Sequence, residues 1–314
     1  MRKTLMTSDQ LGAASEAPYT VVRGGIDDPY RCAVERTYDD SPDLWQRIIG
    51  ESLWFQFGVY DGPAAGQWTP EEAGKAFFER QLDLAAVTGV FDVPVRRVLD
   101  IGCGWGAALD YLLQRLPQCD RFDAVNVSQR QLHHCAQRLA ASGMANRAQL
   151  YLCNAADISM LPDSQSPYDL VIMRGSLTHF TNEVLEACIS GLARRMRVHG
   201  CLIIADNLYN VDLANYQSHV PDIDDRLACG NRKTLASLGE VLSKNGFILH
   251  DTRKLPSNRD SAQWLEQVRS QIEHHFDLNT APRPLVELHG VAENLIAALD
   301  ADKLSTYSII ATLG

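Results

Sequence analysis

Long apolar runs are missing from this sequence of 314 residues, in which no stretch of about 18 uninterrupted apolar residues, the length of a membrane-spanning helix, occurs. Blocks of Lys or Arg are missing too, and the net charge is −10, with 29 basic against 39 acidic residues. Nothing in the charge pattern therefore favours a nucleic-acid partner. No apolar run follows the two basic residues before Met6. The sequence predicts no signal peptide, no membrane association and a cytoplasmic location.

Paired metal-binding or disulfide-forming motifs are also absent. The eight cysteines are irregularly spaced without a CxxC, which predicts reduced, mostly buried thiols. His133-His134 and His274-His275 are adjacent pairs, and neighbours on a helix point about 100° apart. We therefore predict no metal site built from protein ligands alone.

The most informative stretch present runs from Val98 to Gly106 and reads Val-Leu-Asp-Ile-Gly-Cys-Gly-Trp-Gly. An apolar strand leads into Gly102, Gly104 and Gly106, which expose bare backbone and helix N-terminal N–H groups to a ligand. The spacing fits neither the dinucleotide pattern G-x-G-x-x-G nor a P-loop, which requires a Lys. Asp100 instead places a carboxylate where a cationic amino-acid group can bind.

This stretch resembles motif I of the class I S-adenosylmethionine (SAM) methyltransferases. The resemblance implies that Asp100, Gly102, Gly104 and Gly106 hold the amino-acid end of SAM. The alternative is a glycine-rich turn in another doubly wound protein, which nine consecutive fitting residues disfavour.

The rest of the chain alternates between strand and helix patterns, as a parallel sheet requires. Strands are predicted over 97–101, 122–127, 149–153, 170–173, 201–205, 248–254 and 304–313, and helices over 107–115, 129–141, 182–197, 235–244, 261–276 and 285–299. The expected fold is α/β, a Rossmann-like seven-stranded methyltransferase sheet whose last strand is antiparallel in the family. Residues 1–80 are expected to form a helical cap, and 81–314 the methyltransferase domain with a helical insertion over 256–300.

Ligands of open parallel sheets bind beyond the carboxyl ends of the strands, so the residues that follow each strand are candidates for the site. Asn126, Ser128 and Gln131 follow the second strand, where the family usually has an acidic residue for the ribose. This pattern resembles the branch with cyclopropane fatty acid synthases and sterol and prenyl C-methyltransferases. Ser128 is also explained by helix capping alone.

The third and fourth strands are followed by further candidate cofactor contacts. Ala156-Asp157 resembles the family segment whose Asp accepts a hydrogen bond from the adenine amino group, although an Asx turn is the alternative. Arg174 ends the fourth strand. Gly175 stands where many relatives have an acidic residue, which argues against a cyclopropane synthase. His179 matches a histidine common in this branch and is either catalytic or simply packed.

Candidates for the substrate site come from two places. Asn207 and Tyr209 follow the fifth strand and either face a substrate or cap a turn. Eleven of the 24 aromatic Phe, Tyr and Trp residues precede residue 80. The segments around Tyr38 and from Gly50 to Tyr60 resemble the substrate-covering segment of sterol, tocopherol and teleocidin-type prenyl C-methyltransferases, and glycine and sarcosine N-methyltransferases carry a similar one. They supply the substrate candidates Trp45, Trp54, Phe55, Phe57 and Tyr60. Packing of the cap on the sheet is the alternative.

Aromatic residues suit alkene methylation because the reaction leaves a carbocation, which requires a dry, cation-stabilising pocket and one base. Tyr38 and His179 are the predicted catalytic groups. Basic residues at 31, 36, 47, 226, 232 and 233 are available to bind a diphosphate, directly or through Mg²⁺. We therefore predict SAM-dependent C-methylation of an isoprenoid alkene such as farnesyl or geranyl diphosphate, with possible cyclisation or rearrangement. A small-molecule N-methyltransferase is the alternative, and a non-catalytic SAM-binding partner is the third.

Overall fold

The structure is a computed structural model that describes residues 17–26, 28, 30–55, 57–61, 68–219 and 225–314. Its centre is an eight-stranded sheet in the order β1-β4-β3-β2-β5-β6-β8-β7. The strands are β1 (Thr20–Val21), β2 (Arg97–Ile101), β3 (Arg121–Asn126), β4 (Ala148–Leu152), β5 (Tyr168–Arg174), β6 (Met196–Tyr209), β7 (Phe247–Lys254) and β8 (Leu304–Leu313). β8 is antiparallel to its neighbours β6 and β7, and the other pairs are parallel, which confirms the predicted α/β sheet.

All seven predicted strands form, but the expected count was one too low. β1 adds a two-residue parallel pairing to the free edge of β4. So short a strand carries no periodic signal in the sequence, because its partner β4 alone defines it. β6 is also longer than the predicted 201–205, since it continues in both directions along its partners.

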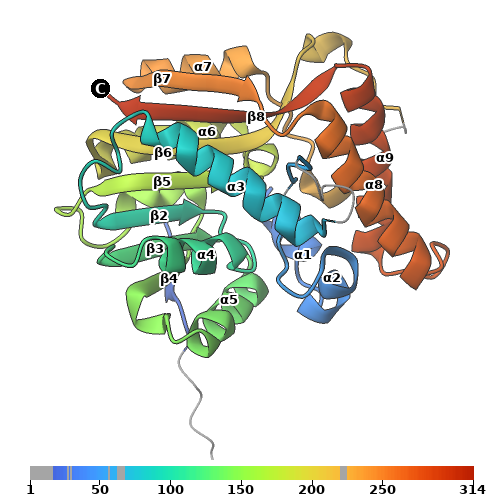
Figure 1. The fold of residues 1–314 in the computed structure, drawn as a ribbon, viewed down its shortest axis with the longest axis horizontal. Coiled ribbons are helices and arrows are strands. Elements are labelled where there is room, and N and C mark those ends of the chain that lie inside the picture. The colour runs from blue at the N-terminus through green and yellow to red at the C-terminus, as the bar shows by residue number, and fades with distance from the viewer. Residues whose placement is uncertain (1–16, 27, 29, 56, 62–67, 220–224) are drawn as a thin grey trace, which may run out of the picture.

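Helices cover both faces of the sheet and one of its ends (Figure 1). They are α1 (Arg31–Thr37), α2 (Pro42–Ile49), α3 (Pro70–Ala86), α4 (Ala107–Arg115), α5 (Gln129–Ala141), α6 (Asn182–Arg195), α7 (Leu235–Lys244), α8 (Asn258–His275) and α9 (Arg283–Asp300). The bounds of α4, α5 and α7 agree with the prediction to the residue. Ser128 caps α5 and Thr234 caps α7, which explains why these starts are readable locally.

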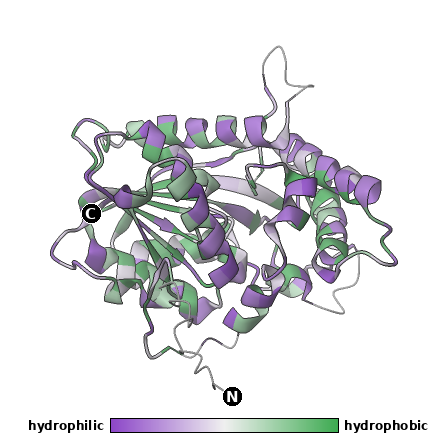
Figure 2. Cartoon of the chain, turned by 90° about the horizontal axis from the view of Figure 1, so that it is seen from below, coloured by the Kyte–Doolittle hydropathy of each residue, from purple (hydrophilic) through white to green (hydrophobic). Residues whose placement is uncertain are grey.

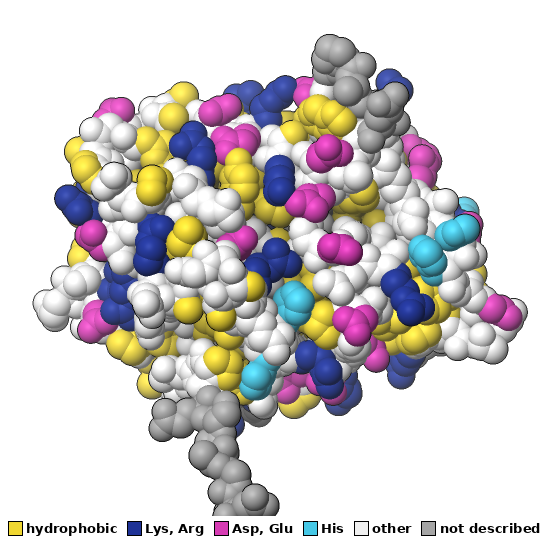
Figure 3. Space-filling model, turned by 60° about the horizontal axis from the view of Figure 1, so that its bottom comes forward, with side chains coloured by type: hydrophobic (Ala, Val, Ile, Leu, Met, Phe, Trp, Pro, Cys, Tyr) yellow, Lys and Arg dark blue, Asp and Glu magenta, His cyan; other side chains and the backbone are white. Residues whose placement is uncertain are grey.

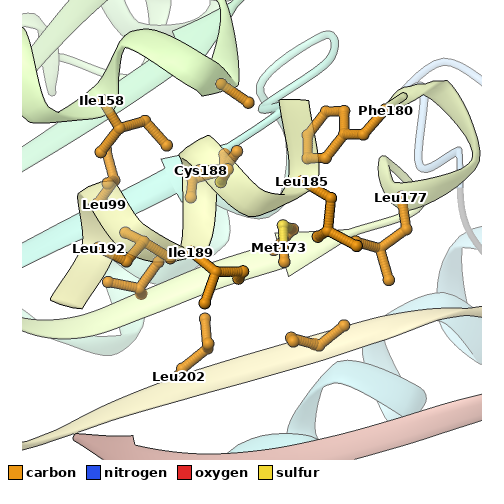
Figure 4. Close-up of a cluster of buried hydrophobic side chains, with 14 of the residues drawn as sticks. Leu99, Ile158, Met173, Leu177, Phe180, Leu185, Cys188, Ile189, Leu192 and Leu202 are labelled. Carbon is orange, nitrogen blue, oxygen red and sulfur yellow. The ribbon is translucent and has the colours of Figure 1, made fainter. Parts of the chain in front are cut away.

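Alternate residues along each strand enter two different cores, one on each face of the sheet. Leu99, Met173 and Leu202 face α6, whose residues Leu185 and Ile189 pack against them (Figure 4). Val98, Leu170 and Cys201 belong instead to the core beneath α3, α4 and α5. Because both faces are covered, the central strands are buried along nearly their whole length, and hydrophobic strands lie at the centre in Figure 2.

A third core joins the two segments that lie beyond the carboxyl ends of the parallel strands. The first helices α1 and α2 and the late helices α8 and α9 gather at this end of the sheet (Figure 1). Their shared cluster includes Trp45 and Ile48 from α2, Trp264 and Val268 from α8, and Leu288 from α9. Segments more than 200 residues apart in sequence therefore form one helical layer, made of α1, α2, α8 and α9. This layer covers the sheet edge where ligands of such folds bind.

Candidate active site

A cavity lies beneath this helical layer, between α1 and the turn that follows β2. It is lined by the glycine turn, by the ends of β3, β4 and β5, and by side chains of the first 60 residues. The predicted residues that line it are Tyr38, Trp54, Phe55, Asp100, Gly102, Gly104, Asn126, Gln131, Arg174 and His179. The fold thus brings residues from both the predicted cap and the predicted cofactor motif to one cavity.

The three positions of the motif require glycine for different structural reasons. All three have positive φ, at 76° for Gly102, 54° for Gly104 and 83° for Gly106. A Cβ on Gly102 would meet Ser176 at 3.0 Å, and one on Gly106 would meet the Cys135 sulfur at 2.5 Å. A Cβ on Gly104 would meet nothing within 4 Å. Gly102 and Gly106 therefore allow close packing, whereas Gly104 keeps space open within the cavity.

Two ionisable side chains of opposite sign, Asp100 and Arg174, line this cavity. Each has buried polar atoms without a hydrogen-bond partner. Asp100 has an unpartnered Oδ2, and Arg174 has unpartnered Nε and Nη2 atoms. Burial raises the pKa of Asp100 to about 7, against the opposing effect of Arg174, and lowers the pKa of Arg174 to about 9. The guanidinium lies 5.0 Å from the ring centre of Phe77 and 4.5 Å from that of Phe78. An amino-acid ligand carries an ammonium and a carboxylate that match these two charges.

The residues after β3 form a small hydrogen-bonded cluster. Asn126 donates from Nδ2 to Gln131 Oε1 at 2.8 Å and accepts at Oδ1 from the Val127 N–H at 2.8 Å. Asn126 and Gln131 line the cavity, and Ser128 accepts from the Gln131 N–H at 3.2 Å as the N-cap of α5. Ser128 therefore positions the start of the helix that carries Gln131.

Asp157 lies behind the cavity lining, on the 3₁₀ helix η3 (Ala155–Met160). Its Oδ2 accepts a hydrogen bond from the Gly24 N–H at 2.9 Å, and this bond holds the segment before α1 against η3. Ala156 also lies outside the lining, whereas Ala155 and Asn154 belong to it. Asn154, which the sequence reasoning missed, donates from Nδ2 to Asp28 at 2.6 Å. The adenine contact of Ala156 and Asp157 stays a prediction.

Tyr38 and His179, the two predicted catalytic groups, meet across 141 residues of sequence. Tyr38 Oη lies 3.3 Å from His179 Nε2, and His179 Nδ1 lies 2.8 Å from the carbonyl oxygen of Ala228. A carbonyl only accepts, so His179 carries its proton on Nδ1 when neutral, and Nε2 accepts from the Tyr38 hydroxyl. Burial lowers the pKa of His179 and raises that of Tyr38, so both groups are neutral near pH 7.

The predicted substrate aromatics separate into a lining and a supporting layer. Trp54 and Phe55 line the cavity. Trp45 is fully buried behind them, with its ring 5.9 Å from Tyr38 and 5.7 Å from Phe55. Further back, Phe57 packs 5.4 Å from Trp264, and Tyr60 donates to Gln267 Oε1 at 2.6 Å. Trp264, another residue missed from the sequence, is the aromatic by which α8 joins this layer.

Asn207 and Tyr209 line a second cavity, which the structure places between η6 (Arg226–Ala228), α9 and the end of β6. Tyr30 and Thr178 line this second cavity, while their chain neighbours Arg31 and His179 line the first, so the two cavities adjoin. The Arg232 guanidinium stacks 4.8 Å from Tyr216 and 5.6 Å from Tyr209.

Two buried charged residues lie near this boundary: Asp206, which was missed in the sequence, and Lys233, a predicted diphosphate candidate that lies outside the lining of the second cavity. Asp206 accepts from the backbone N–H groups of Leu177 at 2.7 Å and Asn207 at 2.8 Å, and burial raises its pKa to about 6. Lys233 donates to the carbonyl oxygens of Phe180 at 2.5 Å and Asn231 at 2.8 Å. Both stabilise the backbone around His179. A charged residue directly after a predicted strand was the available signal for Asp206.

Within the described ranges, no three His, Cys, Asp or Glu side chains are grouped as metal ligands. Among the helices described, none combines the length and apolarity needed to cross a membrane. Basic and acidic side chains are intermixed on the face in Figure 3.

Comparison with known proteins gives the site a context. Residues 98–200 match the family described as a methyltransferase domain. The chloroplastic tocopherol O-methyltransferase of Arabidopsis thaliana is 25% identical over 158 residues, which cover 49% of this chain and 43% of that protein's length. The match thus spans less than half of this relative.

Solved structures with the same fold cover nearly the whole chain. The cyclopropane synthase MmaA2 from Mycobacterium tuberculosis has a TM-score of 0.73 and 17% identity, covering 90% of this chain and 98% of its own. The geranyl diphosphate C-methyltransferase from Streptomyces coelicolor A3(2), in complex with Mg²⁺, a geranyl thiolodiphosphate and S-adenosylhomocysteine, has a TM-score of 0.68 and 16% identity, covering 93% and 100%. Residues 98–200 therefore belong to a methyltransferase domain, and the chain as a whole has the fold of these solved structures.

Proposed function

We propose that this chain is a class I SAM-dependent methyltransferase that methylates an alkene carbon of an isoprenoid. The proposed substrate is a prenyl diphosphate such as geranyl or farnesyl diphosphate. The observation that carries this proposal is the neutral Tyr38–His179 pair, which lies in an aromatic wall of the cavity that also contains the glycine turn. When bound, SAM supplies an electrophilic methyl group.

The cavity has the features that SAM requires. Gly104 leaves space open, and Asp100 and Arg174 present unpartnered charged atoms that complement an amino acid's two charged groups. Asn126 and Gln131 lie on the same side as the end of β3 and offer amides for hydroxyl groups. These residues would hold the cofactor, with its methyl group toward the aromatic wall.

The aromatic wall is suited to the charge that alkene methylation creates. The alkene π pair would form the new C–C bond to the methyl carbon as the bond from that carbon to sulfur breaks and its electron pair stays on sulfur. A positive charge would then develop on the neighbouring substrate carbon. Tyr38, Trp54 and Phe55 offer ring faces or edges at a buried wall, and a well-placed ring contributes about 0.5 to 2 kcal/mol of cation–π stabilisation. None of these side chains is a strong nucleophile, so the cation is not trapped.

The tyrosine and histidine then provide a route for the proton. A C–H bond beside the cation breaks, its electron pair restores an alkene, and the proton passes to Tyr38 Oη. Tyr38 passes its own proton to His179 Nε2, which is unprotonated because Nδ1 donates to Ala228. The pair thus acts as one base that is uncharged until it accepts this proton, when the positive charge moves from the substrate to His179.

The adjoining second cavity fits the polar end of such a substrate. It is lined by Asn207, Thr178, Arg226 and Arg232, together with Tyr209. Amide, hydroxyl and guanidinium groups donate hydrogen bonds to phosphate oxygens. Because the described residues include no ready cluster of metal ligands, Mg²⁺ would enter with the diphosphate as part of the substrate.

The test is incubation of the protein with SAM and a panel of prenyl diphosphates, followed by dephosphorylation and mass spectrometry. We expect a product one methylene unit heavier than the parent alcohol from at least one member. Tyr38→Phe should lower its kcat by about 10²- to 10⁴-fold, which is the usual size of a general acid–base contribution. Absence of any methylated product across the panel would refute the proposal.

Methylation of an amine is the second candidate because Arg31 also lines the first cavity. Its Nε pairs with Glu35 at 2.9 Å, and the guanidinium has further donors for the carboxylate of an amino-acid acceptor. Amine acceptors included in the same assay distinguish the two functions by the mass and retention of the product.

A further inference from the structure

We infer that Glu287, on α9, is a positioning residue that fixes the protonated nitrogen of His179 from outside the cavity. This inference rests on the proposed function, in which His179 Nε2 accepts the proton. Glu287 reaches His179 through the short turn η6, whose last residue, Ala228, accepts the hydrogen bond from His179 Nδ1.

The turn has an unfavourable backbone conformation. Leu227 has a φ of 53° and Ala228 a φ of 51°, so two consecutive residues with side chains occupy the left-handed region. Neither is Gly or Asn, the residues that adopt this region at little cost. Such a conformation persists only where neighbouring contacts enforce it.

Two contacts enforce it from opposite sides. Glu287 Oε2 accepts from the Leu227 N–H at 2.9 Å, while Oε1 accepts from Arg283 Nε at 2.6 Å. On the other side, Tyr30 Oη donates to the carboxylate of Asp225 and accepts from the Gly230 N–H at 3.0 Å. The turn therefore lies between α1 and α9, and Glu287 is hydrogen-bonded to the backbone of Leu227, one of its two strained residues.

The direction of the Ala228 carbonyl decides what His179 can do. While the carbonyl faces Nδ1, that nitrogen must carry the proton, and Nε2 is left to accept from Tyr38. If the turn relaxes, the carbonyl rotates away and the two tautomers compete. Glu287 touches neither cavity-lining surface, so its effect on the reaction passes through the turn.

Nitrogen-15 NMR of histidine-labelled protein with S-adenosylhomocysteine measures the tautomer without any turnover. The His179 signals are assigned by their loss in His179→Gln. In the unaltered protein we expect the Nδ1–H tautomer alone. In Glu287→Ala we expect a mixture, with kcat reduced about tenfold and the KM for SAM unchanged. Glu287→Gln, whose amide oxygen can still accept from Leu227, should keep the single tautomer and most of the activity.

Arg283→Ala is the matched control, because it removes the exposed partner of Glu287 and leaves the bond to Leu227. It should behave like the unaltered protein. If Glu287→Ala does not fold, Glu287→Asp, which is one methylene shorter, should show the mixed tautomer. A single Nδ1–H tautomer in folded Glu287→Ala or Glu287→Asp would overturn the inference, as would an equal loss in Glu287→Gln. Full activity of His179→Gln would instead refute the proposed role of His179, whatever the tautomer.

Discussion

At the scale of single residues, the site depends on ionisable groups that are buried in the cavity wall. Asp100 is 3% exposed and has an unpartnered oxygen, and burial raises its pKa to about 7. Without ligand, the carboxyl therefore binds a proton at a pH where a free Asp is ionised. A cationic ammonium group favours the ionised form, so binding of an amino-acid ligand should expel that proton.

We predict that the affinity for S-adenosylhomocysteine falls as the pH drops below about 7, approaching tenfold per pH unit, because each ligand must displace one proton. Calorimetry between pH 5 and 8, in buffers of different ionisation enthalpy, measures both the affinity and the released proton. Asp100→Asn should bind more weakly at pH 8 and lose this acid dependence. An unchanged acid dependence in Asp100→Asn would assign the proton to another group.

At the scale of elements, the turn from β2 to α4 separates packing from binding. Gly106 precedes α4 directly, and its missing side chain admits Cys135 of α5, whereas Gly104 faces open space. The same Gly-to-Ala change should thus have different consequences two residues apart.

For Gly106→Ala we predict a loss of about 2 to 4 kcal/mol in the free energy of unfolding, from left-handed strain and overpacking together. Gly104→Ala should cost only about 1 to 2 kcal/mol, the strain alone, but should weaken S-adenosylhomocysteine binding at least tenfold because its methyl group enters the cavity. Urea unfolding and calorimetry measure the two quantities. Equal loss of stability with equal affinity would contradict this division.

Elements with local sequence signals could be predicted from the sequence, whereas contacts between distant chain segments could not. Elements with local signals were predicted closely: α5 begins after its cap Ser128, and α7 after its capping box at Thr234. The glycine turn was found because backbone approach to a ligand restricts residue type locally. The pairing of β1, the contact of Asp157 with Gly24 and the turn that holds His179 depend on chain segments far apart in sequence. No periodicity or motif encodes these, since each depends on the assembled fold.

At the scale of the whole molecule, the sheet's two ends have different tasks. The carboxyl ends carry the two cavities described above, while a buried ion-pair network connects the strands at the opposite end. Asp123 is completely buried and accepts from Arg97 Nη2 at 2.6 Å, Arg121 Nε at 2.9 Å and Tyr168 Oη at 2.7 Å. These residues lie near the starts of β2, β3 and β5, so one carboxylate connects three neighbouring strands.

We predict that Asp123→Asn, which keeps the shape but removes the charge, lowers the free energy of unfolding by about 3 to 5 kcal/mol, because it leaves the buried Arg97 guanidinium uncompensated. The matched control Asp120→Asn breaks the exposed pair with Arg96 and should cost less than about 1 kcal/mol. In the folded protein, both variants should bind S-adenosylhomocysteine as the unaltered protein does, since the network lies at the opposite sheet end. Loss of affinity in folded Asp123→Asn would mean that the two ends are coupled through the strands.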